Sequence, residues 1–81
     1  MHSIKVLLAG KGRVIYGAQV DETVYQAITT MDAHNIGSLV VLSGERLVGI
    51  VTERDYLRKV ILKGRASKDT LVEEIMTPNP L

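Results

Sequence analysis

The stretch Gly49–Asp55, which reads GIVTERD, decides the fold because it takes the chain from an apolar run directly into a helix start. Gly49-Ile50-Val51 has the composition of a buried strand, and Thr52 followed by Asp55 is the pattern of a helix N-terminus. At such a junction the first backbone N–H groups have no intrahelical partner, and the helix dipole favours an anion. The stretch therefore predicts a strand that leads into an anion-accepting helix N-terminus.

Thr52 and Asp55 have two interpretations at this point. The Thr52 hydroxyl can donate to a phosphate oxygen, and the Asp55 carboxylate can accept hydrogen bonds from ribose hydroxyls, although it would repel a phosphate. The same spacing is a capping box, which is a common way to begin a helix. Spacing alone favours the cap. The two roles are compatible, because a cap can release its groups when a ligand arrives.

An antiparallel hairpin is predicted just before this junction. Leu39–Leu42 and Leu47–Val51 are continuous aliphatic runs, and Ser43–Arg46 between them has the polar, glycine-containing composition of a turn. Neither run alternates cleanly with polar residues. We therefore expect strands that are covered on both faces.

A helix is predicted before the hairpin. Thr23 and Gln26 have capping-box spacing, and apolar residues then recur at helical intervals. Asn35 and Gly37 are typical of a helix end. Together with the hairpin, this gives the order helix, strand, strand.

Two segments precede that helix. Val14-Ile15-Tyr16 predicts a short strand that Gly17 interrupts. Ile4–Leu8 predicts a short amphipathic turn or helix, which stops at the glycines of residues 9–13.

The residues after GIVTERD predict a second helix capped by Gly64, a polar linker over Arg65–Thr70, and a final helical segment over Leu71–Met76 that leads into an extended stretch. The apolar face of the second helix is predicted to consist of Tyr56, Leu57, Val60 and Ile61.

Length and composition narrow the class of protein. The chain has 81 residues, 46% of them hydrophobic, a formal net charge of +1 and no cysteine. This length accommodates one small domain, and its aliphatic content predicts association with a partner surface. Disulfides and cysteine-ligated zinc are excluded. No apolar run reaches the about 20 residues that span a bilayer, and the first residues do not resemble a secretory signal, so we expect a cytoplasmic protein.

The order of elements and the motifs resemble a cystathionine-β-synthase (CBS) domain. The resemblance rests on Asp21–Val24, Asn35–Val41 and Leu47–Asp55, and it extends through Lys59–Arg65 and Glu74–Pro78, which resemble small bacterial CBS-pair proteins. It implies an α/β (α+β) fold made of a single β-α-β-β-α unit with a short helical segment at each end. Residues 1–70 would form the CBS domain, and residues 71–81 would be a linker or the start of a truncated second repeat.

The resemblance also implies a ligand and the residues that hold it. CBS domains bind AMP, ADP or ATP, and in some cases S-adenosylmethionine or NAD-type ligands. Thr52 would then meet the phosphate and Asp55 the ribose. The other positions carried over are Ile36, Gly37, Ser38 and Ile50 beside the adenine, Thr77 and Lys11 at the entry to the first strand of a repeat, and Arg54 and Arg58 near the phosphate.

The chain departs from the family pattern in carrying only one Thr-x-x-Asp motif. In a CBS pair, each cleft takes this motif from one repeat and its adenine wall from the other. A single unit would hold two half-sites, which a two-fold homodimer would complete.

The predicted function is a regulatory module that senses an adenine nucleotide through dimer packing, with no required cofactor. One rival is a purely structural dimerisation module. Another is a nucleic-acid-binding element, which the near-neutral charge disfavours.

Other chemistry has little support in the sequence. Gly10-Lys11-Gly12 lacks the spacing of a phosphate-binding P-loop, and His2 and His34 have no ligand set around them. No nucleophile and base can be paired, so we predict that the chain is not an enzyme.

Overall fold

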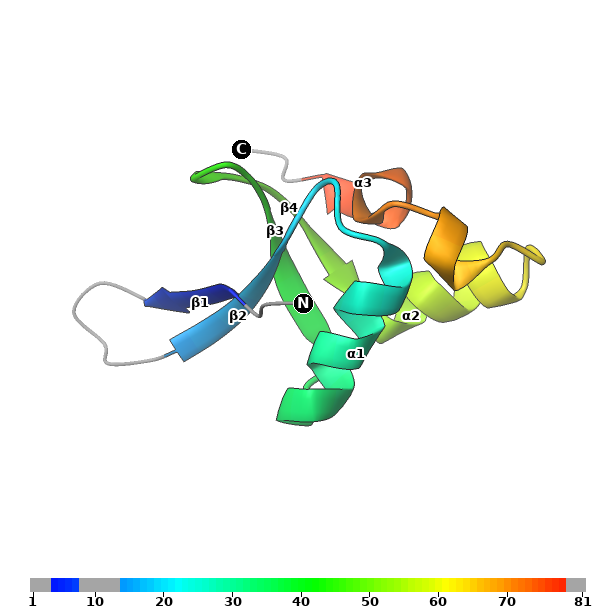
Figure 1. Ribbon diagram of the computed structural model, residues 1–81, viewed down its shortest axis with the longest axis horizontal. Helices are drawn as coiled ribbons and strands as arrows, with labels where there is room; N and C mark the ends of the chain where they lie inside the picture. Colours follow the sequence, from blue (N-terminus) through cyan, green and yellow to red (C-terminus); the bar gives the residue numbers. More distant parts are fainter. Residues whose placement is uncertain (1–3, 8–13, 79–81) are drawn as a thin grey trace.

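The computed structural model describes residues 4–7 and 14–78. Within these residues a five-stranded sheet has the strand order β1-β2-β3-β4-β5, and short helices connect or follow the strands (Figure 1). The strands are β1 (Ile4–Leu7), β2 (Val14–Gln19), β3 (Ser38–Ser43), β4 (Arg46–Thr52) and β5 (Thr77–Pro78). The helices are α1 (Val24–His34), α2 (Glu53–Tyr56), the π-helical turn η1 (Leu57–Ile61), the 3-10 turn η2 (Ser67–Asp69) and α3 (Val72–Ile75).

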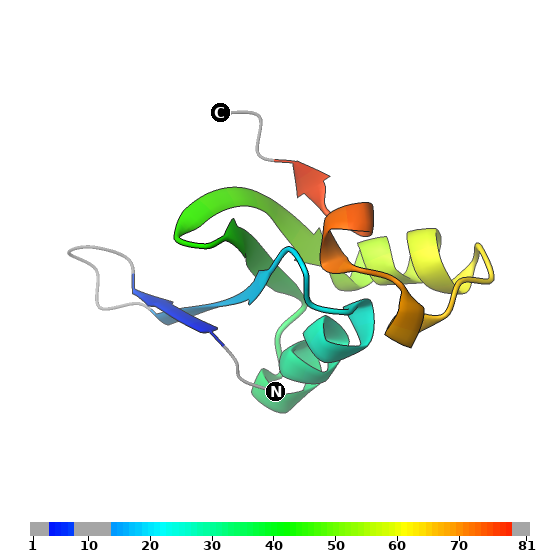
Figure 2. The same ribbon diagram turned by 45° about the horizontal axis from the view of Figure 1, so that its top comes forward.

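The topology confirms the predicted β-α-β-β-α unit. β2 and β3 are parallel and are joined through α1, whereas β3 and β4 form the predicted antiparallel hairpin. β1 and β5 extend the sheet at its two edges, each in an antiparallel pairing. The helices gather at one side of the sheet, and β1 projects away from them (Figures 1 and 2).

The ends of α1 form as the sequence predicts. Thr23 caps the helix by accepting a hydrogen bond from the Gln26 backbone N–H, and the Gln26 side chain accepts in return from the Thr23 N–H. Asn35 ends the helix in the left-handed conformation, at φ 54°. Local hydrogen bonds between residues three apart account for this boundary, so sequence spacing was sufficient to locate it.

The core lies between the helices and one face of the sheet. Its fully buried members come from every layer: Ala18, Val24, Ala27, Met31, Leu39, Val41, Val51, Val60, Val72 and Ile75. The expectation that the hairpin strands are covered on both faces is wrong for this unit. Leu39 and Val41 are buried and point to the helices, whereas Leu47 and Ile50 remain 47% and 48% exposed. Successive side chains alternate between faces, and helices cover only one of these faces.

The N-terminal prediction is also wrong in type. Ile4–Leu7 is a strand, not a helix, and it pairs with β2 in the register Ile4 to Gly17. A four-residue segment is too short for its apolar spacing to distinguish the two periods, and β2 offers hydrogen-bonding partners along its edge. The continuation of the prediction to Leu8 lies outside the described residues.

The sequence suggested that Gly17 interrupts the strand, but Gly17 lies within β2 and does not interrupt it. The strand continues to Gln19 and pairs with β3 through Gly17 and Val40. A Cβ atom at Gly17 would lie 2.9 Å from the Val40 Cγ2 atom, which is closer than two such atoms can pack. Glycine here permits close approach of the neighbouring strand.

The second helix is confirmed in position, but its apolar face is partly wrong. Val60 is buried and Tyr56 half-buried, whereas Leu57 and Ile61 are 51% and 48% exposed. The helix widens after Tyr56 into a π-helical turn, in which the Leu62 N–H donates to the Leu57 carbonyl, five residues back. Widening changes the angular position of the following side chains, so a strict 3.6-residue spacing misplaces them.

The segment after the second helix packs back onto the same unit. The Val24 N–H donates to the Thr70 carbonyl and the Val72 N–H to the Glu22 carbonyl, each at 2.8 Å. Val72 and Ile75 are buried in the core, and β5 then pairs with β4. The predicted α3 helix and the extended residues Thr77–Pro78 are therefore both present.

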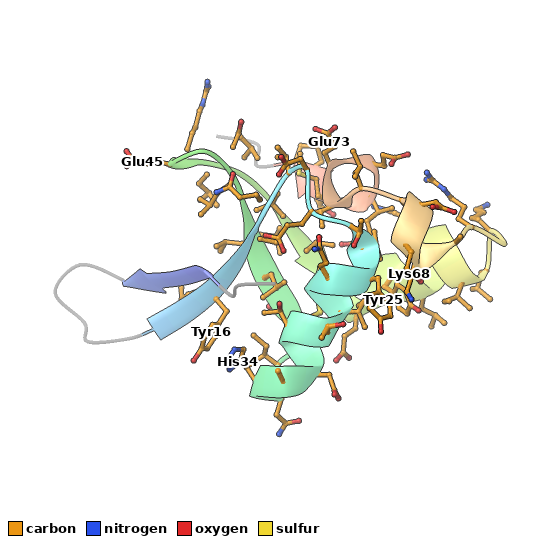
Figure 3. All side chains as sticks on the ribbon, in the orientation of Figure 1. Tyr16, Tyr25, His34, Glu45, Lys68 and Glu73 are labelled. Atoms are coloured by element: carbon orange, nitrogen blue, oxygen red, sulfur yellow. The ribbon has the colours of Figure 1, made fainter. Side chains whose placement is uncertain are left out.

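Two aromatic rings stack where the C-terminal end of α1 meets β2. The rings of Tyr16 and His34 stack with centroids 3.7 Å apart and planes 14° apart, and Lys68 lies over the ring of Tyr25 at the other end of the helix (Figure 3). None of the helices in the described residues is long and apolar enough to cross a membrane.

Candidate functional site

Thr52 and Asp55 form a complete reciprocal cap at the junction of β4 and α2. The Asp55 N–H donates to Thr52 Oγ1 at 3.0 Å, and Asp55 Oδ2 accepts from the Thr52 N–H at 3.0 Å and from the Thr52 hydroxyl at 3.1 Å. This arrangement satisfies backbone donors that the start of a helix leaves unpaired. The capping interpretation of the Thr-x-x-Asp spacing is thus realised in the structure.

The other oxygen of the Asp55 carboxylate is held by Lys59. Lys59 Nζ lies 3.0 Å from Asp55 Oδ1, and the same ammonium donates to the carbonyl oxygen of Ile75 at 2.9 Å. The Asp55 side chain is only 11% exposed, whereas that of Lys59 is 46% exposed. A mostly buried carboxylate needs such partners, because desolvation disfavours its charged form. Both oxygens of Asp55 are therefore engaged inside the unit.

The predicted adenine-contacting stretch lies beside this cap. Ser38 pairs with Thr52 across the β3–β4 ladder, and the Glu53 N–H donates to the Gly37 carbonyl at 3.0 Å. Gly37 and Ser38 are exposed, and Ile36 is partly buried against the core. The structure thus brings Ile36–Ser38 and the helix start together within one copy.

Ile50 and Thr77, both predicted contacts, are directly paired in the β4–β5 ladder. Ile50 lies on the uncovered face of the sheet, two residues before Thr52, and Arg54 is exposed on the first turn of α2. Arg58 is exposed one turn further on. The predicted residue Lys11 lies outside the described residues.

Lys59 is the participant that motif reasoning missed. Four residues separate Asp55 from Lys59, which is the spacing at which an acid and a base meet on one helix face. That spacing could have identified the ion pair from the sequence. The second contact, to Ile75, joins residues 16 apart and depends on how α3 packs.

A separate groove lies on the helix side of the unit. It is lined by Ile28, Met31, Asp32, Glu53, Tyr56 and Leu57 from α1, α2 and the start of η1. Its lining is mostly apolar and includes none of the predicted ligand contacts. Among the residues described, no cluster of three or more His, Asp or Glu side chains is arranged to hold a metal ion.

Comparison with known proteins assigns the family. The model of the CBS domain family matches residues 13–62. The chain is 48% identical over 82 aligned positions to the mitochondrial CBS domain-containing protein CBSX3 of Arabidopsis thaliana. The alignment covers 93% of this chain and 40% of the plant protein.

Solved structures agree with this assignment. A protein with CBS domains from Burkholderia ambifaria MC40-6 superposes with a TM-score of 0.81 at 53% identity, over 84% of this chain and 50% of that one. A CBS domain protein fused to a Zn-ribbon-like domain gives a TM-score of 0.75 at 43% identity, over 79% of this chain and 96% of that one. The chain thus spans half or less of the plant and Burkholderia proteins. Together with the β-α-β-β-α topology and the Thr52–Asp55 junction, these matches establish that the chain belongs to the CBS domain family.

Proposed function

We propose that this CBS unit is a regulatory module that binds an adenine nucleotide at the Thr52–Asp55 junction. The observation that carries the proposal is the reciprocal cap itself, which holds a hydroxyl and a carboxylate side by side where a strand enters a helix. A phosphate oxygen can accept from the Thr52 hydroxyl, and ribose hydroxyls can donate to Asp55. Arg54 is an exposed cation on the same turn.

Binding has to exchange existing hydrogen bonds. Asp55 Oδ2 already accepts from Thr52, so a ribose hydroxyl must either replace the Thr52 hydroxyl or use the remaining lone pairs of Oδ1. When the Thr52 hydroxyl turns to a phosphate, Asp55 Oδ2 keeps its bond from the Thr52 N–H and gains room for a second donor from the sugar. One rotation of a hydroxyl therefore prepares both contacts, and the backbone cap from the Thr52 N–H is retained.

A second CBS unit would close the site. Gly37 and Ser38 are exposed beside the helix start, and Ile50 is 48% exposed on the open face of the sheet. A nucleotide base needs an apolar cover on its other side. A two-fold homodimer is the simplest source of that cover, and a nucleotide bound between the units would change how they pack, which an attached or associated protein can read.

The proposal includes no catalytic role for this unit. The function is ligand-dependent assembly, and the partner that responds to it is a separate protein or domain. We retain the cytoplasmic location as a prediction from the sequence, to be tested by imaging a tagged full-length protein.

Calorimetric titration with AMP, ATP, S-adenosylmethionine and NAD tests the proposal. We expect a saturable signal with at least one adenine nucleotide, and a loss of about tenfold in affinity for Thr52→Val, which removes one hydroxyl hydrogen bond. Thr29→Val is the matched control, since the exposed Thr29 hydroxyl donates only within α1, to the Tyr25 carbonyl. Equal affinity for the Thr52 and Thr29 variants would overturn the assignment of the phosphate contact.

A structural dimerisation module is the second candidate. It is favoured by the fact that Thr52 and Asp55 satisfy each other without a ligand. Exposed apolar side chains on η1, among them Leu57 and Ile61, provide surface for association. Dimers in light scattering, combined with no heat and no thermal shift for any of the four ligands, would support this candidate over nucleotide binding.

A further inference from the structure

We propose that Lys59 is a positioning residue that couples the Thr52–Asp55 junction to the segment through which the chain leaves the unit, α3 and β5. This inference rests on the proposed function, because it concerns how occupation of that junction is transmitted. Its structural basis is the double contact of one ammonium group with Asp55 Oδ1 at 3.0 Å and with the Ile75 carbonyl at 2.9 Å.

The junction end of this connection is the Asp55 carboxylate. Thr52 holds Asp55 Oδ2 through two hydrogen bonds, so Asp55 Oδ1 is the oxygen turned to Lys59. A ligand that withdraws the Thr52 hydroxyl removes one of the two hydrogen bonds that hold Asp55 Oδ2, so in this proposal the carboxylate can turn about the remaining bond from the Thr52 N–H. We expect the Lys59 ammonium to follow the carboxylate, because separating a mostly buried carboxylate from its counterion is costly.

The other end lies on α3. Ile75 is the last residue of that helix, and its carbonyl belongs to the C-terminal set that has no intrahelical donor. Lys59 supplies the missing donor and a positive charge at the negative end of the helix dipole. The Ile75 side chain is 1% exposed, so the carbonyl is presented from a buried anchor.

The exit segment also returns to the same junction along a second route. Thr77 in β5 pairs with Ile50 in β4, two residues before Thr52. The chain therefore closes a ring that runs from β4 through the Thr52–Asp55 cap and Lys59 to α3 and back through β5. Of the links in this ring, the contacts of Lys59 are the ones made by a long, flexible and half-exposed side chain, so they adjust most easily.

Hydrogen exchange measured on the full chain tests the coupling, with AMP as the probe. In the wild type we expect saturating AMP to change exchange in residues 53–55 and, by about threefold or more, in residues 72–77. In Lys59→Met, which keeps most of the length of the side chain and removes the charge, residues 53–55 should still respond and residues 72–77 should not. Lys63→Met, an exposed position one turn further along, is the control and should behave as the wild type.

Two outcomes overturn the coupling. One is a wild-type response confined to residues 53–55, and the other is a response of residues 72–77 that survives in Lys59→Met. Absence of any response to AMP would instead count against AMP as the ligand of the proposed function. The coupling is then decided by Thr52→Ala, which removes the hydroxyl bond to Asp55 without a ligand. It should change exchange in residues 72–77 with Lys59 present and leave it unchanged in the double variant with Lys59→Met, and equal changes in both backgrounds would refute the coupling.

Discussion

A Cβ atom placed on Gly49 would lie 2.6 Å from the carbonyl oxygen of Thr77, inside the distance at which the two atoms can coexist. Gly49 is buried in β4, and the antiparallel neighbour β5 runs beside it, with Pro78 opposite Gly49 in the ladder. The glycine that opens the GIVTERD stretch therefore makes room for the exit segment. Its role is steric, and it is visible only once β5 is paired.

We expect Gly49→Ala to destabilise the protein by about 1–3 kcal/mol, because the neighbouring atom is backbone and cannot move without displacing β5. Urea unfolding measures the free energy, and hydrogen exchange at Met76 and Thr77 reports the displacement. Gly37→Ala is the control, since its nearest contact would be the Glu53 Cδ atom at an ordinary 3.6 Å. A Gly37 variant as unstable as the Gly49 variant would contradict the steric explanation.

Removal of the Thr52 hydroxyl should also reduce stability in the absence of any ligand. Thr52→Ala deletes the acceptor of the Asp55 N–H and one donor to Asp55 Oδ2, and N-cap losses of this kind cost about 0.5–2 kcal/mol. Thr52→Ser retains both groups and should remain close to the wild type. Chemical denaturation is the measurement, and a Thr52→Ala protein as stable as the serine variant would show that the cap contributes nothing.

Stability at acidic pH should depend on Glu74. A hydrogen bond from the Leu71 N–H and a side-chain hydrogen bond from Arg65 hold the pKa of this carboxylate below its ordinary value of 4.5. Because the folded pKa is the lower one, the stabilisation is present above about pH 4.5 and is lost as the pH falls through the folded value.

Urea midpoints measured between about pH 6 and pH 3 should therefore fall less steeply for Glu74→Gln than for the wild type. Glu73→Gln, an exposed neighbour on the same helix, serves as the control. Parallel profiles for the wild type and Glu74→Gln would mean that this carboxylate does not contribute to the pH dependence.

The open face of the sheet should carry the proposed homodimer. Ile50→Glu places a charge on that face, where the dimer would bury it without a partner, and we expect the dimer dissociation constant to rise about tenfold or more. Sedimentation at several concentrations measures this. Leu62→Glu, an exposed position just after η1, is the comparison variant. Dimerisation lost in Leu62→Glu and kept in Ile50→Glu would move the interface to the helix side.

The features that spacing predicted correctly are those made by hydrogen bonds between near neighbours. The caps at Thr23 and Thr52, the left-handed end of α1 at Asn35 and the turn between β3 and β4 each depend on a few consecutive residues. Errors arose where a distant partner decided the outcome. Residues 4–7 became a strand because β2 was available, and Leu57 and Ile61 became exposed because the helix widened over them.

The sequence by itself determined the β-α-β-β-α order, the resemblance to CBS domains that the comparisons confirmed, and the cap at the Thr52–Asp55 junction. Only the tertiary structure decided that one face of the sheet is left uncovered, that β5 packs beside Gly49, and that Lys59 joins Asp55 to Ile75. The physical reason is the range of the interactions. A cap is closed by atoms three residues apart, whereas packing and long side-chain bonds depend on where the whole chain places their partners.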